Sequence, residues 1–433
     1  MLIEFTITNF RSIREGQTFS MESIRKYKEL PKNVLSVGNL SVLKTAVIYG
    51  KNASGKSNLL IAFLALRYIV RKSGSFKINQ KIKCYEPYLF ENKSSNSPVI
   101  FEVLFLGKDK IKYRYKISYN KELILEESLI YYPKNQPVKL FLRKENSVFE
   151  FGERIKDKIG TIQKNLFPNQ LFLSKIGTEK VEELIIPFLF FESFLYVNIP
   201  NQSCNICDKR IIDMHTEQLF SNKDSTFWEN INKLLKIADT GINSISIKET
   251  KEDDFGFPES MSDERKRKIL EENRFQVETK HNLYDNGNII GEVKLELEKE
   301  SSGTNRLLAV GGLILEALSD GTTFVLDELE RSLHPHLTRI IIEMFNDPRT
   351  NPNNAQLIFA THDISILSSE FFRRDQIWFA EKDEKGNSSF YSLGDLKGVR
   401  KDVPFHKYYM KGLFGGIPNV NFYDFDFNIK KYE

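Results

Sequence analysis

The segment from Gly50 to Ser57, Gly-Lys-Asn-Ala-Ser-Gly-Lys-Ser, constrains the fold of this chain more than any other. It matches the spacing G-x-x-x-x-G-K-[ST] and lies between an apolar run at 43–49 and a run at 56–70 with helical spacing of its apolar residues. Glycines let backbone N–H groups converge on phosphate oxygens, the lysine neutralises phosphate charge, and the serine hydroxyl ligates Mg²⁺. The order of strand, loop and helix therefore predicts a phosphate site at a helix N-terminus, whereas the alternative is an ordinary Gly/Ser turn.

Composition sets the class of protein. A chain of 433 residues can bury a large core in two lobes or domains. Its net charge of +4 does not by itself indicate nucleic acid, although a local basic face stays open. Three cysteines fit a reducing compartment, and neither a signal peptide nor an apolar stretch long enough to span a bilayer is apparent. We expect a cytoplasmic protein with no membrane partner.

The pattern along the chain divides it into three parts. Alternating strands between 98 and 132 predict an antiparallel patch, so residues 1–150 form an N-terminal lobe that includes the phosphate loop. Residues 151–275 are mainly helical and charged, and 248–268 is an exposed connection or the tip of an arm. Strands and helices alternate in 276–433, which predicts a parallel sheet in the C-terminal lobe.

A pair of acids in the last third could complete a phosphate site. The run Thr-Thr-Phe-Val-Leu at 322–326 predicts a strand, and Asp327 and Glu328 follow directly. An aspartate at the end of a strand beside the loop would hold Mg²⁺, and the following glutamate could polarise the attacking water. Taken alone, two acids after a strand are also common on protein surfaces.

Two further segments complete a recognisable set. Glu-Ser-Ser-Gly-Thr-Asn-Arg at 300–306 precedes the acids, and Ile-Phe-Ala-Thr-His-Asp at 358–363 follows them. With the phosphate loop and the 324–335 stretch, this set resembles the ABC-type ATPase head in the branch shared with structural-maintenance-of-chromosomes (SMC) and Rad50-like proteins. It is more closely similar to compact bacterial AAA-family ATP-binding proteins, many of which belong to phage-defence or abortive-infection systems. The resemblance covers roughly residues 1–130 and 275–420.

The resemblance implies an α/β fold, namely an ABC-type ATPase head. It has a mixed sheet with the phosphate loop, an antiparallel β subdomain, and a mainly helical insertion between the Walker A loop and the signature motif. It also implies ATP and Mg²⁺ as cofactors. ATP would join two heads into a homodimer, with higher oligomers left open.

Site residues follow from the same resemblance. The residues implied around the nucleotide are Gly50, Asn52, Ser54, Gly55, Lys56, Ser57 and Asn58, with Arg11 of the Asn-Phe-Arg-Ser segment nearby. Ser57 and Asp327 would hold the metal, and Glu328 and His362 would be catalytic. The signature residues Ser301, Ser302, Gly303 and Thr304 would cover the γ-phosphate that the opposite subunit holds.

The chain departs from the family pattern in places. His334 stands where many related heads have an aspartate, and no glutamine loop is clear, since Gln170 and Ser174 are both weak candidates. Cys204 and Cys207 have a zinc-ligand spacing with His215 as a third ligand, but four ligands are required, so structural thiols are favoured.

Three functions are compatible with these features. The first is an ATP-binding and hydrolysing head that acts as sensor or scaffold of an anti-phage defence system and controls a separate effector, such as a nuclease or toxin. The second is a Rad50- or SMC-like DNA-binding repair ATPase, and the third is a non-enzymatic interaction protein. Intact Lys56, Ser57, Asp327 and Glu328 disfavour the third, while the modest net charge weakens the second. Nucleic acid stays open as a partner.

Overall fold

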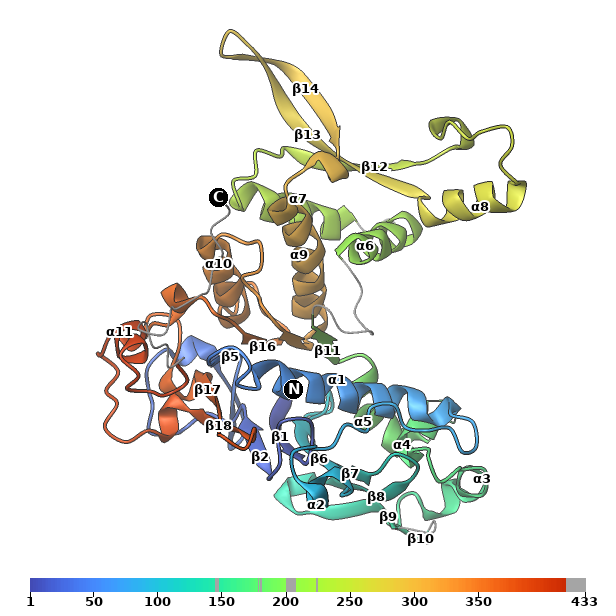
Figure 1. Ribbon diagram of the computed structural model, residues 1–433, viewed down its shortest axis with the longest axis vertical. Coiled ribbons are helices and arrows are strands. Elements are labelled where there is room, and N and C mark those ends of the chain that lie inside the picture. Colours follow the sequence, from blue (N-terminus) through green and yellow to red (C-terminus); the bar gives the residue numbers. More distant parts are fainter. Residues whose placement is uncertain (145–147, 178, 180, 200–207, 223–224, 418–433) are drawn as a thin grey trace, which may run out of the picture.

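Two sheets lie on either side of a helical layer in the computed structural model (Figure 1), which describes residues 1–144, 148–177, 179, 181–199, 208–222 and 225–417. The first sheet has six strands, of which the first five are parallel and β18 is antiparallel. In spatial order these are β11 (Leu195–Asn198), β15 (Thr323–Leu326), β16 (Gln356–Ala360), β5 (Thr45–Tyr49), β17 (Ile377–Lys382) and β18 (Ser388–Ser392). We call it the parallel sheet.

The second sheet is antiparallel throughout and has seven strands. In spatial order these are β10 (Val148–Phe151), β9 (Val138–Lys144), β8 (Ile124–Tyr131), β7 (Lys112–Tyr119), β6 (Val99–Leu106), β1 (Leu2–Thr8) and β2 (Gln17–Ser20). The smaller elements of the two lobes are β3 (Val34–Val37), β4 (Leu40–Leu43), α2 (Asn92–Ser95), α3 (Gly160–Lys164), α4 (Phe172–Lys175) and α11 (Phe405–Met410).

Helices cover both faces of the parallel sheet. Helices α1 (Lys56–Lys72) and α5 (Glu182–Glu192) lie between the two sheets, and α9 (Ser302–Asp320) and α10 (Pro335–Asn346) cover the opposite face (Figure 1). Strand β5 shows this arrangement because its side chains alternate between two cores. Ala46 and Ile48 join the core with α1, whereas Val47 and Tyr49 join the core with α9 and α10. All five residues of β5 are buried, as expected for a parallel strand covered on both faces.

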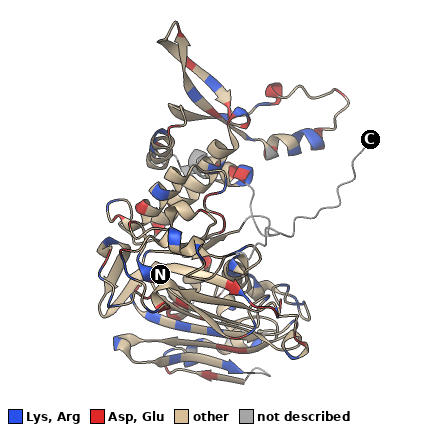
Figure 2. Ribbon diagram, turned by 60° about the vertical axis from the view of Figure 1, so that its left-hand side comes forward, with Lys and Arg blue, Asp and Glu red and all other residues tan. Residues whose placement is uncertain are grey.

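An arm extends from the α9 side of the parallel sheet. It contains α6 (Asp208–Asn222), α7 (Ser225–Ile237), α8 (Asp263–Glu272) and a three-stranded sheet. The strands of that sheet are β12 (Ser244–Glu249), β13 (Phe275–Asp285) and β14 (Asn288–Glu296). The β13–β14 hairpin and α8 project away from the two large sheets, and α8 carries a group of Lys and Arg residues (Figures 1 and 2).

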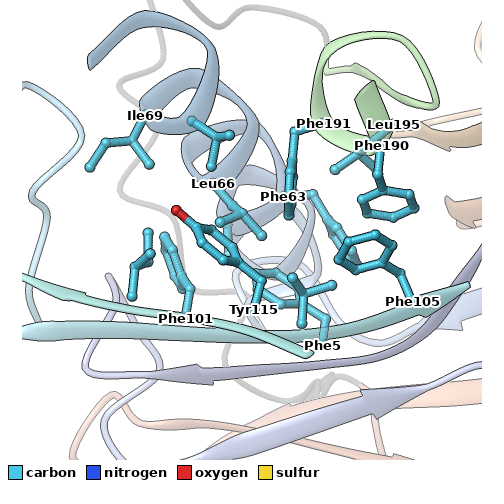
Figure 3. Packing of buried hydrophobic residues seen from close by; sticks show 14 of the residues in the cluster. Phe5, Phe63, Leu66, Ile69, Phe101, Phe105, Tyr115, Phe190, Phe191 and Leu195 are labelled. Atoms are coloured by element: carbon cyan, nitrogen blue, oxygen red, sulfur yellow. The ribbon is translucent and has the colours of Figure 1, made fainter. Parts of the chain in front are cut away.

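Aromatic side chains fill the space between the two sheets (Figure 3). The ring of Phe105 on β6 stacks on Phe190 of α5 with centroids 4.1 Å apart, and Phe5 of β1 meets Phe63 of α1 at 4.5 Å. Aromatic pairs of this kind add stability beyond the area that they bury. The helix that follows the phosphate loop is therefore fixed against a rigid sheet.

The predicted fold class is confirmed, with one correction in detail. Residues 151–275 contain helices α3 to α8, but they also supply β11, which pairs in parallel with β15 at one edge of the parallel sheet. Three of its four residues are buried, so its sequence does not alternate and periodicity did not distinguish it from a buried helix. The domain boundaries at 150 and 275 stay predictions. No helix in the described ranges has the length and hydropathy needed to cross a bilayer.

Candidate phosphate-binding site

Both glycines of the loop are required because two neighbouring strands, β17 and β18, approach the loop too closely for a side chain to fit. Gly55 precedes α1 with φ of 108°, and a Cβ there would lie 2.2 Å from Oγ of Ser388. A Cβ on Gly50 would lie 2.5 Å from the carbonyl oxygen of Ala380. Neither position has room for a side chain, so the loop is held against β17 and β18.

Lys56 is nearly buried at the start of α1, with 6% of its surface exposed. Its Nζ donates to the carbonyl oxygens of Gly50 at 2.8 Å and Lys51 at 3.2 Å. Burial lowers the pKa of Lys56, and the carboxylates of Asp327 and Glu330 oppose that shift. The N-cap residue of α1 is Gly55, and no side chain in the described part of the chain caps this N-terminus. An ammonium group and uncapped helix N–H groups thus meet in one place, which is the chemistry that binds phosphate.

A row of small polar side chains supports the loop from behind. Ser388 donates through Oγ to the carbonyl oxygen of Ser54 at 2.8 Å, and its Oγ lies 2.7 Å from Oγ of Ser12. Asn58 donates through Nδ2 to the same Ser12 Oγ at 2.7 Å. Sequence analysis singled out Asn58 and Ser54 but missed Ser12 and Ser388, because these two serines are 376 residues apart along the chain.

Asp327 lies beside the loop, with 7% of its surface exposed. Its carboxylate accepts a hydrogen bond from the hydroxyl of Ser57. Burial raises the pKa of Asp327, while the Ser57 hydrogen bond and the Lys56 ammonium oppose the shift. A carboxylate and a hydroxyl oxygen side by side are the type of ligand that Mg²⁺ takes from a protein when phosphates supply the rest. The two residues therefore fit a Mg²⁺ ion.

The turn after β15 holds the next acid in an unusual conformation. Glu328 is exposed and has φ of 52°, in the left-handed region that non-glycine residues seldom adopt. Its carbonyl oxygen accepts from the N–H of Arg331 at 3.0 Å. Strain of this kind persists where the surroundings enforce it, and it is concentrated at functional sites.

His362 follows β16 on the same edge of the sheet. Its backbone N–H donates to Oε1 of Glu330 at 2.7 Å. Partial burial lowers the pKa of the His362 imidazole, the Lys56 ammonium lowers it further, and the carboxylates of Glu330 and Glu328 oppose the shift. The imidazole therefore lies within electrostatic range of the loop lysine and of the acids.

The sheet explains why these residues meet. Strands β5, β16 and β15 are neighbours and parallel, so their carboxyl ends open at one edge, where ligands of open α/β sheets bind. The structure thus brings together Lys56, Ser57, Asp327, Glu328 and His362. The carboxyl end of β11 reaches the same edge, where the carbonyl oxygen of Asn198 accepts from the N–H of Asp327 at 3.2 Å.

Arg11 and Asn52 lie at the margin of this cluster. The Arg11 guanidinium is ion-paired with Glu86 and reaches Oδ1 of Asn58 at 3.4 Å, so it lies next to the first turn of α1. Asn52 is exposed on the loop, whereas Ser54 is buried and its Oγ has no hydrogen-bond partner among the described residues.

The predicted signature residues lie elsewhere. Ser301 caps α9 by accepting from the N–H of Thr304 at 3.1 Å, and Ser301 and Ser302 are exposed. A Cβ on Gly303 would lie 2.8 Å from the carbonyl oxygen of Ser332, so the glycine lets α9 pack against the turn that follows β15. Within the described ranges, no hydrogen bond or ion pair joins residues 301–304 to the loop at 50–57.

Neither candidate for the glutamine loop lies at the site. Gln170 donates to the carbonyl oxygens of Gly74 and Phe76, and Ser174 accepts from the N–H of Gly74. Gly74 follows the C-terminal end of the 17-residue helix α1, about 25 Å from Lys56. Both residues therefore have a structural role.

The other candidates have structural partners or lie outside the described residues. His334 caps α10 by accepting from the N–H of His336. His215 is buried, with Nδ1 3.0 Å from Oε1 of Glu316. Cys204 and Cys207, for which structural thiols are favoured over zinc ligands, lie outside the described residues.

Comparisons with solved structures find distant likenesses. An Smc head domain bound to the C-terminal domain of ScpA, from Pyrococcus furiosus, is 12% identical with a TM-score of 0.40 and covers 95% of this chain and 98% of its own. An Smc head domain with a coiled coil and joint, from Pyrococcus yayanosii, is 10% identical with a TM-score of 0.41, covering 95% and 99%. The recombination mediator protein RecF with ATP is 14% identical with a TM-score of 0.37, covering 90% and 97%. At these TM-scores the likeness carries no functional argument.

The family is shown by the sequence itself. No curated protein matches the chain. A sequence model of the family described as "AAA domain, putative AbiEii toxin, Type IV TA system" matches residues 46–166 and 199–368, which is more than half of the 433 residues. Both matched ranges contain parts of the site, because Lys56 lies in the first and Asp327 and His362 lie in the second. The chain therefore belongs to this family of AAA-domain proteins.

Proposed function

We propose that this protein is an ATPase head that binds ATP with Mg²⁺, dimerises around it and hydrolyses it. One observation carries the proposal: Lys56, Asp327, Glu328 and His362 converge beside the uncapped N-terminus of α1. An anion-binding cradle next to a buried acid and an exposed acid is the arrangement that phosphoryl transfer to water requires. ATP and Mg²⁺ as cofactors, and the roles given below to the individual residues, are part of this proposal.

Each residue has a task that its position allows. The loop N–H groups and the Lys56 ammonium hold the phosphates, and Ser57 with Asp327 holds the metal. Mg²⁺ supplies charge neutralisation when bound. Glu328, which is exposed at the open edge of the sheet, orients and deprotonates the attacking water, and His362 contacts the terminal phosphate. Ser301 to Thr304 serve the site of a second subunit, as an exposed and capped helix N-terminus allows.

The test separates binding from chemistry. Lys56→Ala should reduce affinity for a fluorescent ATP analogue by two orders of magnitude or more, because the phosphate charge loses its buried counter-ion, whereas Glu328→Gln should bind ATP normally and lose hydrolysis. A Glu370→Ala variant, altered at an exposed acid on another loop, serves as the control. Normal hydrolysis by Glu328→Gln would exclude the proposed role of that residue.

We further propose that the head acts in an anti-phage defence system and controls a separate effector. The description of its family, which names the putative AbiEii toxin and a Type IV toxin–antitoxin system, supports this role. Purification of the protein from its host should recover the effector, and phage challenge should show loss of protection with Lys56→Ala. Full protection against phage by Lys56→Ala would show that the defence role does not depend on the nucleotide site.

A DNA-binding role is the second candidate, and one surface favours it. Arg265, Arg267 and Lys268 are exposed on α8, and within the described ranges none of them forms an ion pair, whereas Lys266 pairs with Glu252 (Figure 2). A cluster of basic residues on a projecting helix can contact phosphates without a high net charge. Duplex binding that weakens steeply with salt, and that is lost when the three residues become Gln, would support this candidate.

A further inference from the structure

Glu330 is the third acid in the segment Asp-Glu-Leu-Glu at 327–330, and neither the sequence motifs nor the proposed mechanism assign it a task. It stands in the turn after β15, but its side chain reaches the segment after β16. Its Oε1 accepts from the backbone N–H of His362 at 2.7 Å. The two residues are 32 positions apart, so this bond joins two separate loops of the site.

The bond to His362 is the only side-chain hydrogen bond of Glu330 within the described part of the chain. Its other carboxylate oxygen, Oε2, is buried and has no partner there. A buried carboxylate oxygen without a partner is unfavourable, so the carboxylate is retained here at a cost in stability. Glu330 is half-buried, and an acid whose side-chain hydrogen bond joins two loops is more informative than an acid in a surface ion-pair network.

The turn that carries Glu330 is itself fixed. The carbonyl oxygen of Glu330 accepts from the N–H of Leu333 at 2.9 Å, and the preceding turn is closed by the bond from Arg331 to Glu328. Leu329, between the two acids, is fully buried. Glu330 therefore projects from a rigid turn, and a group that it binds is fixed relative to Asp327 and Glu328.

The segment after β16, whose His362 N–H donates this bond, is less regular than the turn that carries Glu330. His362 is exposed and is followed by a short 3-10 helix at Ile364–Ile366. The N–H of Thr361 is held by the carbonyl oxygen of Ile48, and the N–H of Asp363 by the hydroxyl of Thr361. Among the residues that the structure describes, the bond that the His362 N–H donates to Glu330 is the one that ties this amide to the loop carrying the acids.

We propose that Glu330 is a positioning residue for His362. It holds the His362 backbone so that the imidazole stays beside the loop lysine and the exposed acid before nucleotide arrives. Glu330 itself does not touch the substrate in this assignment. The inference deepens the proposed function and rests on it for its effect on hydrolysis, although the hydrogen bond itself can be tested without nucleotide.

The first arm of the test uses the full-length, nucleotide-free protein. Hydrogen–deuterium exchange of a peptide covering residues 361–368 should be about tenfold faster or more at the His362 amide in Glu330→Ala, because a charged acceptor is lost. Glu330→Gln keeps a carbonyl oxygen and should stay close to wild type. Glu330→Met, which fills the same space without an acceptor, should behave as the alanine variant and covers the case in which the alanine variant does not fold. Glu370→Ala should leave the peptide unchanged.

The second arm measures ATP hydrolysis. Glu330→Ala should lower kcat while KM for ATP stays within about twofold, and Glu330→Gln should restore most of the rate. The double variant Glu330→Ala/His362→Ala should be no slower than His362→Ala, since residues that act as one unit are not additive. Losses that multiply would overturn the assignment, as would unchanged exchange in both Glu330→Ala and Glu330→Met. If the wild-type protein does not hydrolyse ATP, the proposed function fails, and the exchange arm still decides whether Glu330 holds His362.

Discussion

Asp327 is kept in the interior although its proposed task requires a negative charge. The residue is 7% exposed, and burial raises the pKa of its carboxyl group. A raised pKa in the folded state means that ionisation of the carboxyl destabilises the nucleotide-free fold. Binding of a metal would remove that cost, which is typical of a functional site that is built at the expense of stability.

The raised pKa of Asp327 predicts how the stability of the nucleotide-free protein changes with pH. An unfolded aspartate ionises above about pH 4, whereas folded Asp327 keeps its proton to a higher pH, so the wild type loses stability relative to Asp327→Asn as pH rises through this window. Asp327→Asn should therefore be the more stable of the two proteins at pH 7, and its advantage should shrink as the pH falls toward 4. Thermal unfolding of both proteins without nucleotide or Mg²⁺, from about pH 4 to pH 7, measures it.

An exposed acid supplies the control for that experiment. Asp253→Asn, at an exposed aspartate on the arm, is compared with wild type in the same way. If Asp327→Asn is the less stable protein at pH 7 by the same margin as at pH 4, the carboxyl group does not carry the cost that we assign to it.

The elements of the site differ in how far sequence predicted them. The phosphate loop and Asp327 were found because a loop between a strand and a helix is a local pattern. The parallel strands β15 and β16 were found for the same reason. Strand β11 was missed because a short, fully covered strand has no alternation. The signals for Gln170 and Ser174 were misleading, since a residue type in a plausible loop does not show which end of α1 it will meet.

Local sequence patterns also could not predict which other elements support the phosphate loop. Ser388 belongs to β18 and Ser12 to the segment after β1, and only the assembled sheets bring them to the loop. Ser388 bonds to the loop backbone and Ser12 bonds to Ser388 and Asn58, so both support the backbone that would hold the ligand. This contribution should be visible as a loss of affinity without a change in the phosphate contacts.

We therefore predict the effect of Ser388→Ala. The variant leaves the carbonyl oxygen of buried Ser54 without its donor, which costs about 1–3 kcal/mol and loosens the loop. Affinity for an ATP analogue should fall by about tenfold or more, measured by titration, together with the melting temperature. Ser389→Ala is the matched control because Ser389 is half-buried and points to the other face of β18. Equal effects of the two substitutions would contradict the proposed support.

At the scale of the whole molecule, the exposed N-terminus of α9 has no partner in its own phosphate loop. Ser301 and Ser302 are exposed, and β14 of the projecting hairpin leads into them through a short turn at Leu297–Lys299. A second copy of the chain, related by twofold symmetry, would use the same pair of surfaces twice. The dimer in the proposed function is thus the simplest way to occupy this helix end.

The proposed dimer predicts a change in molecular mass when ATP binds. Glu328→Gln with ATP and Mg²⁺ should elute at twice the monomer mass in size-exclusion chromatography with light scattering, because hydrolysis no longer releases the two heads. Adding Ser302→Arg to that protein should prevent the shift, since an arginine at the helix tip blocks close approach while the phosphate loop stays intact. Ser319→Arg, at the exposed other end of α9, should leave the dimer in place.

A complementation experiment tests the same idea by mixing. Ser302→Arg protein supplies an intact phosphate loop, Lys56→Ala protein supplies an intact helix tip, and a mixture should recover hydrolysis that neither has alone. A monomeric mass for Glu328→Gln at saturating ATP would rule out the ATP-joined dimer.

The order of strands in the parallel sheet determines when this site can form during synthesis. The strand that leads into the phosphate loop emerges from the ribosome early, but its two neighbours are β16 and β17, and Gln356 at the start of β16 bonds to Leu43 across 313 residues. A nascent chain that has released its loop but not its last third can pack α1 on the antiparallel sheet, but it lacks β16, β17 and the Ser388 hydroxyl that hold the loop from the other side. If the protein hydrolyses ATP as we propose, turnover therefore begins only when translation is nearly finished, and a chain that ends before β15 is inactive.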